Sequence, residues 1–186
     1  MLVHFLDRKL LEPSIFFVHA MIEVLDDIGA HPACMPESQP PALRLGWLLI
    51  MSKSVETYRG VAYPWNCDSM GHMNTQFYAA LYDGASFHFL SLLAPSGELK
   101  KSGLGWADVR QLIEYKHEIT AGGLLVVRTA LKRLGNKSIE YRHELRNVET
   151  DHLYSTSEQV TVLFDLNKRA AIPLDETIRR RAAALA

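Results

Sequence analysis

The chain has 186 residues, enough for one domain with a single sizeable core and some excess at one end. Its net charge is −1 and its acidic and basic residues are interspersed, which argues against a nucleic-acid-binding surface. Two cysteines are too few for a disulfide scaffold, and they predict a protein of the reducing cytoplasm. No apolar run reaches the roughly 18 residues of a membrane span. Asp7, Arg8 and Lys9 stand where a signal peptide would be apolar, so we expect no targeting segment.

Residues 1–50 differ in pattern from the rest of the chain. Residues 14–28 carry apolar side chains at helical spacing and predict a helix. Residues 31–42 contain four prolines, which no regular element tolerates, and 43–51 fit a short strand or a buried turn of helix. We therefore expect an N-terminal extension with a proline-rich linker. Two interpretations stay open: an accessory hairpin packed on the main domain, or an assigned start that precedes the natural one at Met51.

The pattern becomes clearer from Val55. Residues 55–65 are rich in β-branched and aromatic residues up to Pro64 and predict a strand. Asn74 is a good N-cap residue for a helix that must end before Pro95. The expected apolar stripe of this helix consists of Phe77, Tyr78, Leu81, Ala85, Phe89 and Leu92.

Four further strands and a final helix follow. Residues 109–120 alternate with period two and predict a strand with one buried face. Turn sequences separate it from three more strands, at 124–134, 138–147 and 152–165, and residues 173–186 predict a closing helix. Consecutive strands with short turns pair antiparallel, and a sheet that wraps the long helix covers its apolar stripe. We therefore expect an α+β fold with an antiparallel sheet around one long central helix.

The segment DSMGHMNTQFYAALYD, Asp68 to Asp83, places an acid, a Gly-His pair and an asparagine at the start of that helix. It resembles the D-x-x-G-H-x-N-x-x-x-Y signature of hotdog-fold acyl-CoA thioesterases of the 4-hydroxybenzoyl-CoA thioesterase-like group. Residues 113–123 resemble that family's second strand and turn, and residues 134–147 resemble its G-x-x-S hairpin. The resemblance covers about residues 55–172 and implies a hotdog domain over 51–186 with a C-terminal helix.

The resemblance implies an enzyme that hydrolyses an acyl-CoA thioester to a free acid and coenzyme A. The motif aspartate is the family's key carboxylate, as nucleophile or as general base, and here it is Asp68. Register with the motif indicates the N–H of Thr75 as the oxyanion donor, assisted by Asn74, because the first turn of a helix has unpaired N–H groups and a partial positive charge. Asn74 as a pure N-cap is equally compatible with the motif.

Other motif positions are assigned to substrate binding. Gly71 lets the backbone approach the substrate closely, and Tyr78 is expected in the core with part of its ring lining the pocket. For His72 we favour a structural role in the loop over proton transfer. Asp83 resembles an acid of several family members, although a solvated helix face explains it nearly as well.

The remaining site predictions concern coenzyme A, histidines and metals. Arg133, Lys137 and Ser138 flank a turn and are assigned to coenzyme A binding. His117 and His143 lie on otherwise apolar predicted strand faces, and we interpret both as satisfied structural residues. No His/Cys/Asp/Glu cluster has ligand spacing, so we expect no metal, and no cofactor beyond the coenzyme A of the substrate.

Two other functions stay open. A hotdog hydratase or dehydratase acting on enoyl or hydroxyacyl thioesters would share the fold, but the Gly-His-x-Asn order fits it poorly. A non-catalytic acyl-CoA-binding module with a regulatory role would need a DNA-binding segment, and residues 1–50 show neither a basic patch nor a clear helix-turn-helix. A lone hotdog domain leaves a strand edge open and its site half-built, so we expect a cytoplasmic homodimer or homotetramer. The acyl group is not specified by the sequence.

Overall fold

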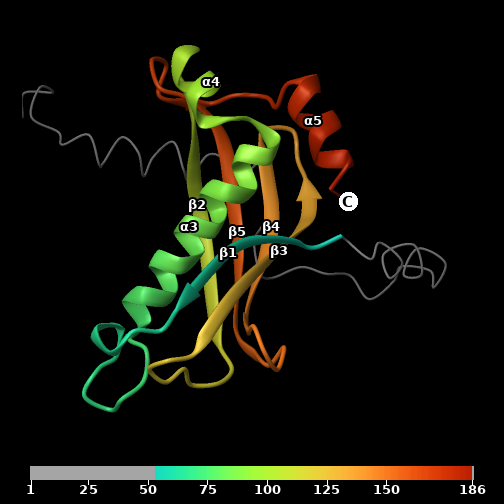
Figure 1. Cartoon of the computed structure of the whole chain (residues 1–186). Helices are drawn as coiled ribbons and strands as arrows, with labels where there is room; N and C mark the ends of the chain where they lie inside the picture. The colour runs from blue at the N-terminus through green and yellow to red at the C-terminus, as the bar shows by residue number, and fades with distance from the viewer. Residues whose placement is uncertain (1–52, 186) are drawn as a thin grey trace, which may run out of the picture.

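The computed structural model describes residues 53–185, so the expectations for residues 1–50 lie outside the described residues. The elements are β1 (Val55–Val61), the 3-10 helix η1 (Pro64–Asn66), α3 (Thr75–Leu93), α4 (Ser96–Lys101), β2 (Leu104–Tyr115), β3 (Leu124–Leu134), β4 (Ser138–Asn147), β5 (Leu153–Asp165), β6 (Ala170–Ala171) and α5 (Glu176–Ala183). Figure 1 shows α3 lying across one face of a curled sheet, with α4 and α5 at the end of the sheet that is remote from the start of α3. The predicted sheet around one long helix is confirmed.

The sheet has the strand order β1-β3-β4-β5-β2, all neighbours are antiparallel, and β6 extends the pairing of β5. β2 therefore pairs with β5 on one side only, and its other edge is open within the part of the chain that the structure describes. The expectation that consecutive strands are neighbours is wrong for β2 and β3. The connection between them passes beneath the start of α3, where the N–H of Met73 donates to the carbonyl of Ile119 over 2.7 Å and Ile119 is fully buried.

β2 also differs from the strand predicted over residues 109–120. It begins at Leu104 and ends at Tyr115, and Val109 is its one buried residue. The register with β5 shifts between Asp108 and Arg110, which is the mark of a β-bulge. Val109 consequently packs with Val160 and its neighbours on β5, in a cluster separate from the one that Ile113 contacts. The bulge breaks the period-two pattern, so one buried face could not form along the whole strand.

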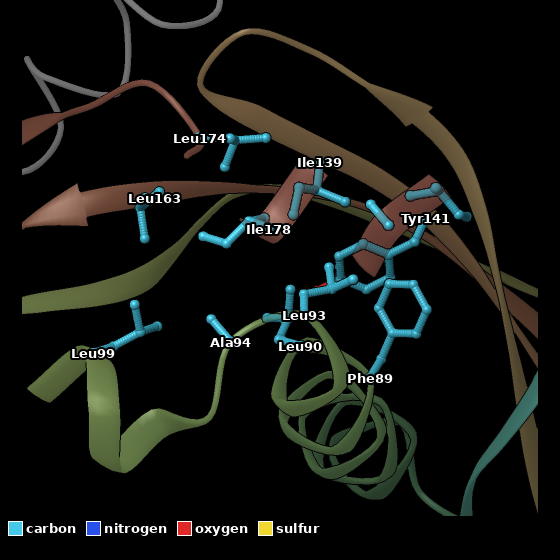
Figure 2. Close-up of a cluster of buried hydrophobic side chains, with 12 residues drawn as sticks. Phe89, Leu90, Leu93, Ala94, Leu99, Ile139, Tyr141, Leu163, Leu174 and Ile178 are labelled. Atoms are coloured by element: carbon cyan, nitrogen blue, oxygen red, sulfur yellow. The ribbon is translucent and has the colours of Figure 1, made fainter. Parts of the chain in front are cut away.

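α3 begins directly after Asn74, the residue predicted as its N-cap. Asn74 has extended backbone angles, and its Oδ1 accepts the N–H of Gln76 over 3.1 Å. The helix runs as expected to Leu93, but the predicted stripe fails at its end, because Leu92 is 48% exposed and Leu93 is fully buried instead. Figure 2 shows the C-terminal half of α3 against the sheet and the C-terminal segment. The cluster includes Phe89, Leu90, Leu93, Ile139, Tyr141, Leu163, Leu174 and Ile178.

The predicted closing helix is confirmed as α5. The Oδ1 of Asp175 accepts the N–H of Ile178 over 2.8 Å and caps its start. Ile178 and Ala182 are buried against the core, and the guanidinium of Arg181 donates to the carbonyl of Leu93 over 3.0 Å. α5 therefore covers the end of the core beside the last turn of α3. No helix in residues 53–185 is long and apolar enough to cross a membrane.

A chain of buried polar side chains links α3 to the sheet. The hydroxyl of Ser86 lies 3.0 Å from His143 Nε2, and Thr129 Oγ1 lies 2.6 Å from His143 Nδ1. Thr57 Oγ1 continues the chain, 2.7 Å from Thr129 Oγ1. His143 is fully buried, and burial lowers the pKa of its imidazole to about 3, so the ring is neutral at physiological pH. The structure thus agrees with the interpretation of His143 as a satisfied structural residue.

Candidate active site

Asp68 begins a tight hairpin between η1 and α3. Its N–H donates to the carbonyl of His72 over 3.0 Å, and its own carbonyl accepts the N–H of Gly71 over 3.0 Å. Gly71 has φ of +82°, which a residue with a side chain rarely adopts, so glycine is required here by the turn. One carboxylate oxygen of Asp68, Oδ1, accepts the N–H of Met70 over 2.8 Å. Oδ2 has no hydrogen-bond partner among the described residues, so one carboxylate oxygen is held in place while the other is available.

The start of α3 supplies a free donor beside this hairpin. The N–H of Gln76 is taken by the Asn74 side chain, and the N–H of Phe77 donates to the Asn74 carbonyl over 3.0 Å. The N–H of Thr75 donates to no atom of residues 53–185. The first turn of a helix carries a partial positive charge, so this N–H is placed to bind a developing anion. Asn74 is seen as the N-cap, and its Nδ2 makes no hydrogen bond within the described range.

A pocket of about 450 Å³ brings the hairpin and the helix start together. Five of the predicted site residues line it: Asp68, His72, Asn74, Thr75 and Tyr78. Its other walls come from Met70, Met73, Tyr115, Lys116, His117 and Glu118. The last four belong to the end of β2 and to the connection that crosses beneath α3, so the crossing builds the wall opposite Asp68.

Two side-chain contacts define the pocket walls. Tyr78 is buried, and its ring meets that of Tyr115 edge to face with centroids 5.0 Å apart. Burial raises the pKa of Tyr78 to about 12, so this wall is a neutral phenol. At the other side, Nε2 of His72 lies 3.1 Å from Oε2 of Glu118. The pocket therefore combines a buried aromatic wall with a polar side at Asp68, His72 and Glu118.

Other predicted residues are not gathered at this pocket. Gly71 shapes the hairpin and does not line the pocket; a methyl group added there would meet nothing within 4 Å. Asp83 is exposed on α3 and lines a different cavity of about 260 Å³, together with Ser86, Trp106 and Asp108. Within one chain, therefore, Asp83 does not contribute to the pocket of Asp68.

The three residues assigned to coenzyme A lie at the turn between β3 and β4, at the end of the sheet remote from the start of α3 (Figure 1). β3 has eleven residues at about 3.3 Å each, so this turn is roughly 30 Å from the Asp68 end of the strand. Arg133 pairs with Glu140 over 3.2 Å, Lys137 is half-buried, and Ser138 is buried. A single chain does not bring them to the Asp68 pocket.

Sequence reasoning missed the wall from Tyr115 to Glu118. His117 was expected on an apolar strand face, but it is exposed, follows the end of β2 and lines the pocket. Its ring lies 4.2 Å, centroid to centroid, from that of His152. No local pattern distinguishes these residues, because they reach the site only through the crossing between β2 and β3. Within residues 53–185, no group of three or more His, Cys, Asp or Glu side chains could hold a metal ion.

Comparison with protein families decides the assignment. A family model described as the thioesterase-like superfamily matches residues 62–182, about two thirds of the chain. The chain belongs to this superfamily. The match covers the hairpin, α3 and every strand of the sheet except β1. The predicted family and its enzyme class, thioester hydrolase, are confirmed at this level.

Solved structures agree in fold with this thioesterase-like chain. A hypothetical protein from Staphylococcus aureus in complex with CoA has a TM-score of 0.66 at 16% identity, over 72% of this chain and 85% of the other. A 1,4-dihydroxy-2-naphthoyl-CoA thioesterase from Synechocystis has a TM-score of 0.61 at 17% identity, over 69% and 95%. A putative thioesterase from Pseudomonas putida has a TM-score of 0.62 at 22% sequence identity, over 71% of this chain and 84% of the other. These likenesses confirm the hotdog fold. No curated protein sequence matches the chain significantly.

Proposed function

We propose that the protein is an acyl-CoA thioesterase, which hydrolyses an acyl-CoA to a free acid and coenzyme A. One observation carries the proposal: an available carboxylate oxygen of Asp68 and the unpaired N–H of Thr75 face one pocket. Hydrolysis of a thioester needs these two groups, a carboxylate to attack or to activate water and a donor for the oxyanion. Superfamily membership and the solved CoA thioesterases of the same fold support the choice of thioester.

The proposed reaction assigns one role to each group. The thioester oxygen accepts the N–H of Thr75, and a donor of this kind is typically worth roughly 10²–10³ in rate. Asp68 either attacks the carbonyl carbon or takes a proton from the attacking water, a base contribution of roughly 10²–10⁴. The free Nδ2 of Asn74 can assist as a second donor. The neutral Tyr78 contributes a wall that excludes water from the reacting thioester.

We also propose that the active form is a homodimer or larger, built on the open edge of β2. An unpaired edge of a twelve-residue strand invites pairing with a second copy. Two copies related by a two-fold axis pair antiparallel, so the Leu104 end of one β2 lies beside the Tyr115 end of the other. The cavity at Asp83 and Trp106 of one subunit would then adjoin the Asp68 pocket of its partner.

Such pairing accounts for the predicted residues that one chain leaves apart. In one subunit the linings of the two pockets lie toward opposite ends of β2, whose Leu104 and Tyr115 ends are roughly 35 Å apart by strand length, although both pockets also reach α3. Trp106, whose buried indole N–H has no partner among the described residues, lines the smaller pocket. We propose that this pocket receives the acyl group and that the turn of Arg133, Lys137 and Ser138 approaches the coenzyme A of the partner's site, in a cytoplasmic enzyme without a metal or further cofactor.

The test is release of free thiol from a panel of acyl-CoAs, measured for the wild type, Asp68→Asn and the control Asp175→Asn. Asp175 caps α5 and is not among the residues that line the Asp68 pocket, and asparagine is an equally good cap, so the control should keep its rate. Thiol release that is lost in Asp68→Asn alone supports the proposal. A hydratase would change the enoyl absorbance without releasing thiol, and a binding module would bind acyl-CoA without turnover. Either result would reject thioesterase activity.

A further inference from the structure

The backbone and the imidazole of His72 make separate contacts. Its backbone builds the loop: the carbonyl accepts the N–H of Asp68 over 3.0 Å, and the residue forms a β-bridge with Thr120. Any side chain would allow these backbone contacts. The imidazole makes one polar contact, between its Nε2 and Oε2 of Glu118 over 3.1 Å. The backbone contacts and the imidazole contact to Glu118 both agree with the structural role expected for His72, and the Glu118 contact also fixes the orientation of the ring.

The imidazole lies at the mouth of the Asp68 pocket. Both His72 and Glu118 line that pocket, and their side chains are 31% and 73% exposed. An acyl-CoA bound there must direct its large, charged coenzyme outward, because the pocket of about 450 Å³ has no room for it. The thioester sulfur, which joins acyl group and coenzyme, therefore leaves toward the mouth, where the imidazole stands.

We propose that His72, oriented by Glu118, is the general acid that protonates the departing coenzyme A thiolate; this inference rests on the proposed thioesterase function. Glu118 accepts the Nε2–H, which leaves Nδ1 as the proton-donating nitrogen. Nδ1 has no hydrogen-bond partner within residues 53–185. A carboxylate that orients one imidazole nitrogen while the other transfers a proton is the division of labour found in hydrolase triads.

The step balances without any further reactant. The carbon–sulfur bond breaks, its electron pair goes to sulfur, and the proton of Nδ1 moves to that sulfur to give the free thiol. The carbon–oxygen bond forms with water, directly or after attack by Asp68, and the proton released by water returns to His72 through solvent. The sum is acyl-CoA plus water giving carboxylate, free thiol and one proton.

Two other basic side chains of the pocket, Lys116 and His117, are less suited to this role. The ammonium of Lys116 lies 3.2 Å from a carboxylate oxygen of Glu114, a residue that does not line the pocket. The ring of His117 lies against that of His152, with centroids 4.2 Å apart. His72 is the pocket histidine that an acidic side chain of the same pocket orients.

The experiment varies the leaving group. The kcat of the wild type, His72→Gln, Glu118→Gln and the control His88→Gln is measured on two thioesters of the same acyl group. One carries N-acetylcysteamine, an alkyl thiol like that of coenzyme A, and the other carries thiophenol, whose thiolate leaves readily without a proton. His88 is an exposed histidine on α3 outside the described pockets, so its variant should behave as wild type on both substrates.

We expect His72→Gln to lose about 10²-fold or more on the alkyl thioester, the usual worth of a general acid, and less than about threefold on the phenyl thioester. Glu118→Gln should show the same pattern with a smaller loss, and added imidazole should restore His72→Gly on the alkyl thioester. Equal losses on both substrates, or no loss on either, would overturn the inference while leaving the thioesterase standing. A wild type that hydrolyses no acyl thioester at all would overturn the proposed function, and the inference with it.

Discussion

The buried His143 predicts how the stability of the fold depends on pH. In the folded chain burial lowers the pKa of this imidazole from 6.5 to about 3, because Ser86 and Thr129 enclose it and no charge compensates the cation. The unfolded chain exposes the ring, which then binds a proton near its ordinary pKa of about 6.5. Between those two values the unfolded state holds one proton more than the folded state. Stability contributed by the neutral ring is therefore complete above pH 6.5 and is lost as the pH falls.

The size of the loss follows from the same two pKa values. One proton of difference lowers the free energy of unfolding by about 1.4 kcal/mol per pH unit inside the window. Integrated from pH 7.5 to pH 5, the loss from His143 is about 2 kcal/mol, a sizeable part of the usual stability of roughly 5–15 kcal/mol. The carboxyl groups of Glu158 and Asp165, whose pKa values are lowered by Lys132 and by the backbone N–H of Lys168 respectively, act mainly below pH 5, the lower end of this integration. Their contribution is present above their unfolded pKa values and disappears only as the pH falls further.

Urea unfolding followed by circular dichroism at pH 7.5, 6.5, 5.5 and 5.0 measures this loss. The wild type and the control His88→Gln should each lose about 2 kcal/mol more than His143→Gln over the range. Imidazole ¹⁵N spectra of folded wild type at pH 5 should show a neutral His143 ring, which tests the reasoning even where the glutamine variant does not fold. A protonated ring at pH 5, or the same loss in His143→Gln as in wild type, would refute the argument.

Three further outcomes are expected. Asp68→Asn should lower kcat by roughly 10²–10⁴ and change the free energy of unfolding by less than about 1 kcal/mol; a folded variant within about threefold of wild type would return Asp68 to the role of a turn residue. Light scattering at micromolar concentration should find at least a dimer, and a stable monomer would contradict the pairing through β2. A chain truncated to start at Met51 should fold, dimerise and keep most of its thiol-releasing activity. If it proves dimeric but inactive, residues 1–50 contribute to the pocket and their interpretation as a dispensable extension is wrong.

Local interactions are the part of this protein that its sequence determined. Asn74 caps α3 where its residue type predicts, and Asp175 caps α5 inside the predicted closing helix, because a cap is a contact between residues two or three positions apart. The turn from Asp68 to Gly71 is equally local, since only glycine tolerates its positive φ at little cost. β3, β4 and β5 match their predicted ranges to within a residue because alternation along a paired strand is a property of the segment itself.

Non-local pairing was decided by the tertiary structure alone. The period-two pattern of residues 109–120 could not show that β2 pairs with β5 instead of β3, or that a bulge at Val109 would break its buried face. At the end of α3 the buried residue is likewise Leu93 and not the predicted Leu92. Residues of α5 complete the core there, and the sequence pattern of α3 contains no information about that contact.

The candidate site divides in the same way. Asp68, His72, Asn74 and Thr75 were readable from one motif, since a hairpin and the helix start that follows it bring them together within eight consecutive residues. Glu118 reaches His72 only because the connection between β2 and β3 crosses beneath α3, held there by the hydrogen bond from Met73 to Ile119. The sequence therefore determined the relative positions of the Asp68 carboxylate and the proposed oxyanion donor, because both belong to one short segment. The tertiary structure decided the opposite wall and the partner of the imidazole, because contacts between distant segments depend on the path of the whole sheet and leave no periodic trace in either segment.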